Sequence, residues 1–351
     1  MTNPIDLSIG QPEFDVPEPI KTGALDAIRA GRNGYTVTQG IEPLRERLLQ
    51  RYADRFGAEE ISDEAIMVTS GVSGGLTVAF LAVLDPGDEI LIPDPYFPLY
   101  PQLATLLGAR PVAYDTYPDF CLDVEKLAEL VTDRTRAILV NSPSNPTGHA
   151  MSEAEARAVS KFADERGLLI ISDEIYEDFV YEGGHVSPRE FTRNCIVLSG
   201  ASKNMGMPGW RVGWMLGRRD LIERCHVVQQ FTFVCAPAPA QWAALEGLDY
   251  DFTAIRDSYR AKRDLIYSGL HEQYPMQRSG GSIYAFPHLP AGATIGRFMD
   301  ACIERQLLLV PGTACSAKAS HFRLSFAAEN DTLDSAIDLL NDIALRGDFS
   351  G

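Results

Sequence analysis

The stretch Ser199-Gly-Ala-Ser-Lys203-Asn-Met-Gly-Met-Pro-Gly-Trp-Arg211-Val-Gly-Trp214 places a lysine among small residues and an arginine between glycines. An apolar run at 195–198 precedes it and predicts a strand. A lysine near cationic groups or in a dry pocket loses its proton more easily, so Lys203 is a candidate for covalent chemistry. The guanidinium of Arg211 could hold a phosphate. The alternatives are a surface lysine and a strand arginine in a surface ion pair.

A second run, Thr69-Ser-Gly-Val-Ser-Gly-Gly-Leu76, ends a predicted strand and opens a predicted helix. Backbone N–H groups at the N-terminus of a helix form a phosphate site. The run is not the dinucleotide-binding fingerprint, because it lacks both the Gly-x-Gly-x-x-Gly spacing and a suitably placed acid. It therefore indicates a phosphate-bearing ligand of another kind.

Two more runs, Ser144-Asn-Pro-Thr-Gly148 and Ser172-Asp-Glu-Ile-Tyr176, each follow an apolar strand. Asp173 could hold a pyridine nitrogen in its protonated form, although an aspartate at this place could also cap a helix or turn. Tyr176, three residues on, could donate to a ring oxygen, or could be a packed core tyrosine. Asn145 lies in a segment that could also be a simple turn.

Together and in this order, the four runs indicate pyridoxal 5′-phosphate (PLP) held as a Schiff base on Lys203. This cofactor needs a lysine amine, a phosphate cradle, a carboxylate for the ring nitrogen and a donor for the ring oxygen. Phe97 could stack on the ring, with Tyr96 as its near rival. Arg323, flanked by apolar residues, could bind a substrate carboxylate, or pair with an internal acid.

The order of predicted elements indicates an α/β fold. Apolar runs at 65–69, 136–141 and 168–172 predict buried parallel strands, and 152–165 predicts a helix that Ser152 and Glu155 would cap. In such a sheet ligands bind at the carboxyl ends of the strands, which is where these motifs fall. Beyond about 250 the pattern predicts a long helix at 252–272, a strand pair near 282–287, a helix near 294–305, strands near 307–310 and 321–326, and a last helix at 332–345.

Composition and charge exclude several function classes. A net charge of −17 argues against nucleic acid and against an anionic membrane surface as partners. The six cysteines form no Cys-x-x-Cys pair and none lies with histidines at metal-ligand spacing, so we expect no metal site and reduced thiols in a cytoplasmic protein. We also expect neither a signal peptide nor a membrane span.

With these residues quoted, the chain resembles the class I/II aminotransferases of PLP fold type I. The resemblance runs from Ser8-Ile-Gly-Gln-Pro12 to Arg323-Leu-Ser-Phe326. It implies a large domain, at 35–248, with a mostly parallel central sheet sandwiched by helices, and a smaller α+β domain at 249–351. Residues 1–34 would form an N-terminal arm that packs with the small domain. It also implies a homodimer with the active site at the interface.

The resemblance carries roles to individual positions. Lys203 would be the Schiff-base lysine and proton shuttle in ping-pong transfer from an L-amino acid to a 2-oxo acid. The other implied contacts are Asp173 to the ring nitrogen, Tyr176 and Asn145 to the ring oxygen, Val72, Ser73 and Arg211 to the phosphate, Phe97 to the ring face, Tyr35 to the neighbouring subunit's phosphate, and Gly10, Asn145 and Arg323 to the substrate.

The chain departs from the family pattern at three points. Gly200 stands where many members have a phosphate-binding serine, so Ser199 or Ser202 would replace it or the contact would be lost. The helix that usually leads into the arm is nearly absent. No arginine is assignable to the side chain of a dicarboxylate substrate, which counts against aspartate-type specificity.

Two rival functions remain at this stage. A carbon–sulfur lyase, cyclase or amino-acid oxidase on the same scaffold would share the carbanion and differ in its fate. A ligand-sensing module fused to a DNA-binding domain would need a basic winged-helix segment, which this acidic chain lacks.

Overall fold

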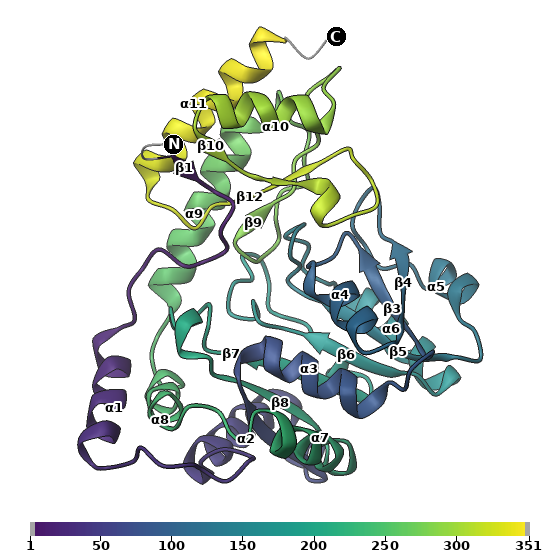
Figure 1. Cartoon of the computed structure of the whole chain (residues 1–351), viewed down its shortest axis with the longest axis vertical. Coiled ribbons are helices and arrows are strands. Elements are labelled where there is room, and N and C mark those ends of the chain that lie inside the picture. Colours follow the sequence, from purple (N-terminus) through teal and green to yellow (C-terminus); the bar gives the residue numbers. More distant parts are fainter. Residues whose placement is uncertain (1–3, 348–351) are drawn as a thin grey trace.

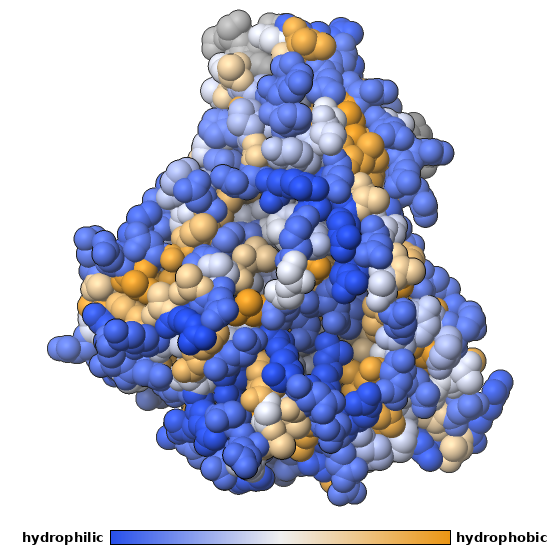
Figure 2. Space-filling model, turned by 180° about the vertical axis from the view of Figure 1, so that it is seen from behind, coloured by the Kyte–Doolittle hydropathy of each residue, from blue (hydrophilic) through white to orange (hydrophobic). Residues whose placement is uncertain are grey.

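The computed structural model describes residues 4–347 as a larger part built on a seven-stranded sheet and a smaller part that contains both ends of the described chain (Figure 1). Seen from the side opposite to Figure 1, the surface is mostly hydrophilic with separate hydrophobic patches (Figure 2). None of the helices within residues 4–347 combines the length and apolarity that a membrane crossing needs.

The large sheet has the strand order β2-β8-β7-β6-β5-β3-β4 and is mostly parallel, as expected. Only β8 runs antiparallel to its two neighbours. The strands are β2 (Glu64–Thr69), β3 (Glu89–Asp94), β4 (Arg110–Asp115), β5 (Thr135–Asn141), β6 (Leu169–Asp173), β7 (Cys195–Gly200) and β8 (Gly213–Arg218).

Helices cover both faces of this sheet, so its central strands are apolar at successive positions. Ile170 and Ile171 are neighbours in β6, yet they belong to core clusters on opposite faces. One face packs against α3 (Gly71–Val83), α4 (Leu99–Leu106) and α7 (Arg219–Thr232). The other packs against α2 (Glu42–Phe56), α5 (Val124–Leu130), α6 (Glu153–Arg166) and α8 (Ala238–Gly247).

The predicted cap of α6 is confirmed. The Ser152 side chain accepts from the Glu155 N–H at 3.3 Å, and the Glu155 carboxylate accepts from the Ser152 N–H at 2.8 Å. Gly167 ends the helix with a φ of 64°, a conformation that glycine adopts without a steric cost.

The smaller part joins a three-stranded antiparallel sheet, in the order β11-β12-β9, to three helices. Its elements are α9 (Thr253–Leu270), β9 (Tyr284–Ala285), α10 (Ile295–Glu304), β10 (Leu307–Leu308), β11 (Val310–Pro311), β12 (Phe322–Ser325) and α11 (Asn330–Arg346). The strand pair expected near 282–287 is wrong: one short strand lies there, and its partner β12 follows almost 40 residues later. A local apolar pattern does not reveal so distant a partner.

The N-terminal segment contacts both parts. Strand β1 (Ile5–Asp6) pairs in parallel with β10, while α1 (Glu18–Arg29) packs against α8. The segment between β1 and α1 is fixed on α9, where Glu13 accepts hydrogen bonds from Tyr259 and Lys262. We keep 34/35 and 248/249 as the proposed boundaries of arm, large domain and small domain.

Candidate active site

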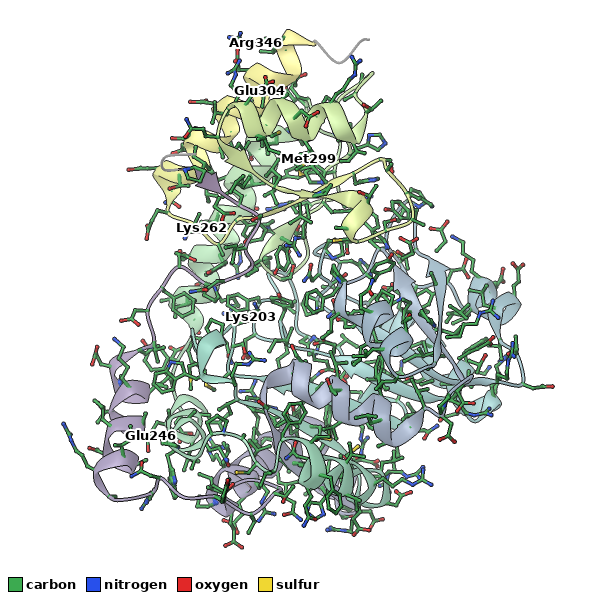
Figure 3. All side chains as sticks on the ribbon, in the orientation of Figure 1. Lys203, Glu246, Lys262, Met299, Glu304 and Arg346 are labelled. Atoms are coloured by element: carbon green, nitrogen blue, oxygen red, sulfur yellow. The ribbon has the colours of Figure 1, made fainter. Side chains whose placement is uncertain are left out.

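A cavity of about 300 Å³ lies at the carboxyl ends of the central strands, between the two parts of the molecule. Lys203 lies there in the middle of the structure, above α3 and below β9 in the view of Figure 3. Every site residue predicted from the sequence except Tyr35 lines this cavity. They are Gly10, Val72, Ser73, Phe97, Asn145, Asp173, Tyr176, Lys203, Arg211 and Arg323.

Lys203 is half-buried at the cavity, with its Nζ donating to the backbone carbonyl of Gly10. Burial and the positive charges of Arg323 and Arg211 lower the pKa of this amine to about 8, while Asp173 acts in the opposite direction. Roughly a tenth of the amine is therefore neutral at pH 7, far more than for an exposed lysine, and nucleophilic attack on a carbonyl requires this neutral form. The alternative of a surface lysine is wrong.

Asp173 ends β6 and is only 3% exposed. The Tyr100 hydroxyl donates to its Oδ2 at 2.8 Å, and the Ile175 N–H donates to its Oδ1 at 3.2 Å. Burial raises the pKa of Asp173 to about 6, although both hydrogen bonds lower it. A buried carboxylate of this kind gains from a cationic partner, such as a protonated ring nitrogen.

Tyr176 and Phe97 both line the cavity. The Tyr176 hydroxyl lies 3.2 Å from that of Tyr284, and burial raises the pKa of Tyr176 well above its ordinary value. Phe97 lines the cavity whereas Tyr96 is not among the lining residues and is tied to Cys315 through a backbone hydrogen bond of 2.7 Å. Of the two rivals for a ring-stacking position, Phe97 is thus the one at the cavity.

The N-terminus of α3 and Arg211 form the cationic end of the cavity. A side chain at Gly71 would place its Cβ 2.6 Å from Arg211 Nη2, so the guanidinium rests directly on this turn of backbone. Arg211 itself has φ 58°, a left-handed conformation that costs a non-glycine residue on the order of 1 kcal/mol. Its guanidinium donates to the carbonyls of Pro208 and Ser70, no ion pair among residues 4–347 includes it, and it precedes β8, so the surface ion pair of a strand arginine is not seen.

The structure shows which of the two candidates, Ser199 or Ser202, could replace a serine at position 200. Gly200 on β7 pairs with Gly213 on β8. A side chain at Gly200 would bring its Cβ within 2.8 Å of Gly213 Cα, so this position admits only glycine. Ser199 points away, with its hydroxyl donating to Glu177 at 2.6 Å. Ser202 lines the cavity and is the available hydroxyl.

Arg323 on β12 is buried at 8% exposure. Its Nη1 donates to Asn145 Oδ1 at 3.0 Å and its Nη2 donates to the Ser8 carbonyl at 2.7 Å. Its Nε is buried and has no hydrogen-bond partner. Within residues 4–347 its hydrogen-bond partners are uncharged and no Asp or Glu forms an ion pair with it, so the internal-acid alternative does not hold.

Sequence reasoning missed three polar side chains at this site: Tyr100, Asn141 and Tyr284. Asn141 bridges two predicted residues, because its Oδ1 accepts from the Asn145 N–H at 2.8 Å and its Nδ2 donates to the Asp173 carbonyl at 2.9 Å. Its place at the last residue of β5 is a signal that could have found it. Nothing local distinguishes Tyr284 from other strand tyrosines.

Tyr35 lies away from the cavity and is 89% exposed. A large aromatic side chain so exposed gains nothing from the fold of its own chain, which leaves it available to another surface.

Two side-chain clusters have residue types that bind metals, although the sequence spacing indicates neither. Cys121, His149 and Glu155 offer ligand atoms within 4.8 Å of one another, as do Glu174, Glu177 and His185. In the first, the Glu155 oxygens already accept from His149, Leu122 and Ser152. In the second, Arg51 and Arg55 supply the opposite charge. These existing partners account for both clusters.

The cavity thus meets the four requirements of a pyridine cofactor with a phosphate group. The lysine amine, the carboxylate, the hydroxyl donor and the helix N-terminus with its arginine all face one space. Arg323 lines the same space.

Comparison with known proteins agrees with this arrangement. Residues 2–340 match the family model "Aminotransferase class I and II". The chain is 33% identical to a probable aspartate aminotransferase of Methanocaldococcus jannaschii, over 97% of this chain and 93% of that protein. It is 34% identical to the aspartate/prephenate aminotransferase of Thermus thermophilus, over 95% of this chain and 89% of that one.

Solved structures show the same fold. An aromatic aminotransferase from Pyrococcus horikoshii superimposes with a TM-score of 0.93 and 31% identity, covering 100% of this chain and 98% of that one. A mutant of the Thermus thermophilus aspartate aminotransferase has a TM-score of 0.92 and 33% identity, covering 97% and 92%. The chain therefore belongs to the class I and II aminotransferases and is a PLP-dependent aminotransferase.

Proposed function

We propose that this protein moves the amino group of an L-amino acid to a 2-oxo acid in two half-reactions, with Lys203 as the lysine that binds the cofactor and carries the proton. The observation that carries the proposal is the single cavity that brings Lys203, Asp173 and Arg323 together, and the lowered pKa of Lys203 agrees with it. When bound, the cofactor supplies an electron sink for the substrate carbanion.

The residues present fit the cofactor. The N–H groups of Val72 and Ser73, the Arg211 fork and the Ser202 hydroxyl would hold its phosphate, since anions bind at the N-terminus of a helix. Asp173 would accept from the ring nitrogen. The remaining contacts would come from Tyr176 and Asn145 at the ring oxygen and from Phe97 at the ring face.

Lys203 would act on the substrate through its Nζ. When free, its neutral amine would take the proton from the substrate Cα and hold it for return later in the transfer. The Gly10 carbonyl, which accepts from Nζ, limits where the amine can move. Arg323 and Gly10, which both line the cavity, would meanwhile hold the substrate carboxylate.

The test is an absorbance titration of the purified PLP-bound protein with single amino acids, without an acceptor. We expect the visible cofactor band to disappear with the true donor and to return when a 2-oxo acid is added, with ping-pong kinetics. Lys203→Ala should lower steady-state turnover by at least about 10⁴-fold, while Lys161→Ala, at an exposed site on α6, should not change it. Retained turnover in Lys203→Ala, or ammonia release without an acceptor, would contradict the proposal.

We further propose that the protein is a cytoplasmic homodimer. The exposed side chains Leu25 and Ile28, which line one largely apolar surface groove, and the exposed Tyr35 support the dimer, because a contiguous apolar surface is typical of an interface. The absence of any disulfide among the six free cysteines supports a reducing compartment. Net negative charge argues against nucleic acid as a partner.

A further inference from the structure

Tyr284 is a buried tyrosine that the proposed chemistry leaves without a role. It lies on β9, is 3% exposed and lines the active-site cavity. Its register partner on β12 is Ser325, which places it next to the strand that carries Arg323. Figure 3 shows β9 just above Lys203. This strand therefore brings a side chain of the smaller part to the cavity that contains Lys203.

The Tyr284 hydroxyl contacts the hydroxyl of Tyr176 at 3.2 Å, with the rings edge to face at 5.8 Å. In this arrangement Tyr176 donates. A hydroxyl has one proton, so a Tyr176 that donates to a cofactor oxygen gives up the bond to Tyr284. The Tyr284 hydroxyl can then rotate and donate to Tyr176, and donation to its oxygen makes Tyr176 a stronger donor.

The ring of Tyr284 supports Arg323. The guanidinium carbon lies 4.5 Å from the ring centroid, within the range of a cation–π contact. Because Asn145 and the Ser8 carbonyl hold the two Nη atoms, the ring face and these two acceptors together fix the plane of the guanidinium. The direction of the Nε–H bond, which has no hydrogen-bond partner, is fixed together with that plane.

The surroundings of Tyr284 leave its side chain little freedom. A Cβ on Gly10 would lie 1.6 Å from the Tyr284 oxygen, so the hydroxyl occupies the space above this glycine. On the backbone side, the Tyr284 carbonyl accepts from the Ser279 hydroxyl at 2.7 Å. Both the head and the base of the side chain are therefore fixed.

We propose that Tyr284 is a positioning residue with two separable effects, its hydroxyl directing the Tyr176 proton toward the cofactor and its ring face orienting Arg323 for the substrate carboxylate. The inference rests on the proposed roles of Tyr176 and Arg323. It predicts that removing the hydroxyl and removing the ring have different consequences.

The hydroxyl is tested with Tyr284→Phe in the PLP-bound protein. The measurement is the pH at which the visible cofactor band changes in the absence of substrate, which reports protonation of the nitrogen shared with Lys203. Without the Tyr284 hydroxyl, Tyr176 is a weaker donor to the ring oxygen, and that oxygen then stabilises the proton on the nitrogen more strongly. We therefore expect the midpoint to move to higher pH by about 0.5 unit. Tyr274→Phe is the matched control, because its buried hydroxyl donates to Leu340 at 2.6 Å outside the cavity.

The ring is tested with Tyr284→Leu. The dissociation constants of two non-reacting acids, 3-phenylpropionate and maleate, are measured by titrating the cofactor band, and KM and kcat are measured for the donor. We expect weaker binding and a higher KM, each by about tenfold, with a smaller change in kcat, whereas Tyr284→Phe should keep the affinity for the acids close to wild type. If Tyr284→Leu does not fold, Tyr284→Met replaces it, since methionine fills irregular space.

An unchanged midpoint in Tyr284→Phe, or the same shift in Tyr274→Phe, would overturn the effect of the hydroxyl. Unchanged acid affinity in Tyr284→Leu would overturn the effect of the ring. If the wild-type protein does not form the cofactor band, or does not convert it with any amino acid, the proposed function itself is contradicted. The two failures are therefore distinguishable.

Discussion

The ionised carboxylate of Asp173 lowers the stability of the folded protein when no cation lies opposite it. Burial displaces its pKa upward from 3.8 to about 6, since few partners replace the water that the carboxylate loses. Such a displacement corresponds to about 3 kcal/mol at pH 7. A bound cofactor with a protonated ring nitrogen would offset this cost.

This cost predicts that Asp173→Asn stabilises the cofactor-free protein. A carboxyl with a raised pKa favours folding below its unfolded pKa, near 3.8, and loses that contribution as the pH rises through about 6. Asparagine is neutral throughout. The mutant should thus gain up to about 3 kcal/mol at pH 7 and little at pH 4, measured as thermal midpoints across this range.

Asp334→Asn, on the exposed side of α11, is the control and should show no such pH dependence. The PLP-bound protein should respond in the opposite way, with weaker cofactor binding in Asp173→Asn. A cofactor-free Asp173→Asn protein that is less stable than wild type at pH 7 would contradict this view of the buried charge.

Among the elements, local capping and tertiary packing differ in how far the sequence predicts them. The α6 helix begins at its predicted cap because the signal lies within four residues. The strand β4 is not evident from the sequence, because Arg110-Pro-Val-Ala-Tyr-Asp115 lies at the edge of the sheet and only Tyr114 is buried. The strand β8 is not evident from the sequence either, because it begins at Gly213, a glycine that the site requires.

At this scale we predict that Ser152→Ala destabilises the protein by about 1 kcal/mol, since it removes the side-chain partner of the Glu155 N–H. Ser335→Ala within α11 is the control: its hydroxyl bonds back to Asp331 at 2.8 Å, so its loss should be neutral or slightly stabilising. Urea unfolding of both variants provides the measurement. Equal effects would argue against the cap as the source of stability.

For the whole molecule, the proposed dimer predicts complementation between two inactive forms. If Tyr35 serves the partner's site, a mixed dimer of Lys203→Ala and Tyr35→Phe chains contains one site with both native residues. Cofactor affinity and turnover should then recover at that site, whereas either variant alone stays defective. Mixed dimers of Lys203→Ala and Lys161→Ala chains, which keep one native site regardless of Tyr35, provide the reference.

Sedimentation should give twice the chain mass of 38.5 kDa. A fully active monomer, or mixed dimers that recover nothing, would refute the dimer or the role of Tyr35 respectively. The exposed Phe231 offers a further control, because Phe231→Asp should weaken association without altering any residue of the cavity.

The sequence determined the fold class and ten of the eleven predicted site residues. Most of them follow a strand or lie in a glycine-containing turn, whereas Arg323 lies within β12 and Gly10 was placed by the family resemblance. In a parallel sheet such ends meet at one edge, so order along the chain is enough to place Lys203, Asp173 and Asn145 together.

Only the tertiary structure decided the rest. Tyr100 reaches Asp173 across 73 residues of chain and Tyr284 reaches Tyr176 across 108, and no local pattern encodes contacts so distant. The exclusion of a side chain at Gly200 likewise depends on how close β8 packs. Periodicity reports which face of an element is buried, whereas the identity of the neighbour follows from packing alone.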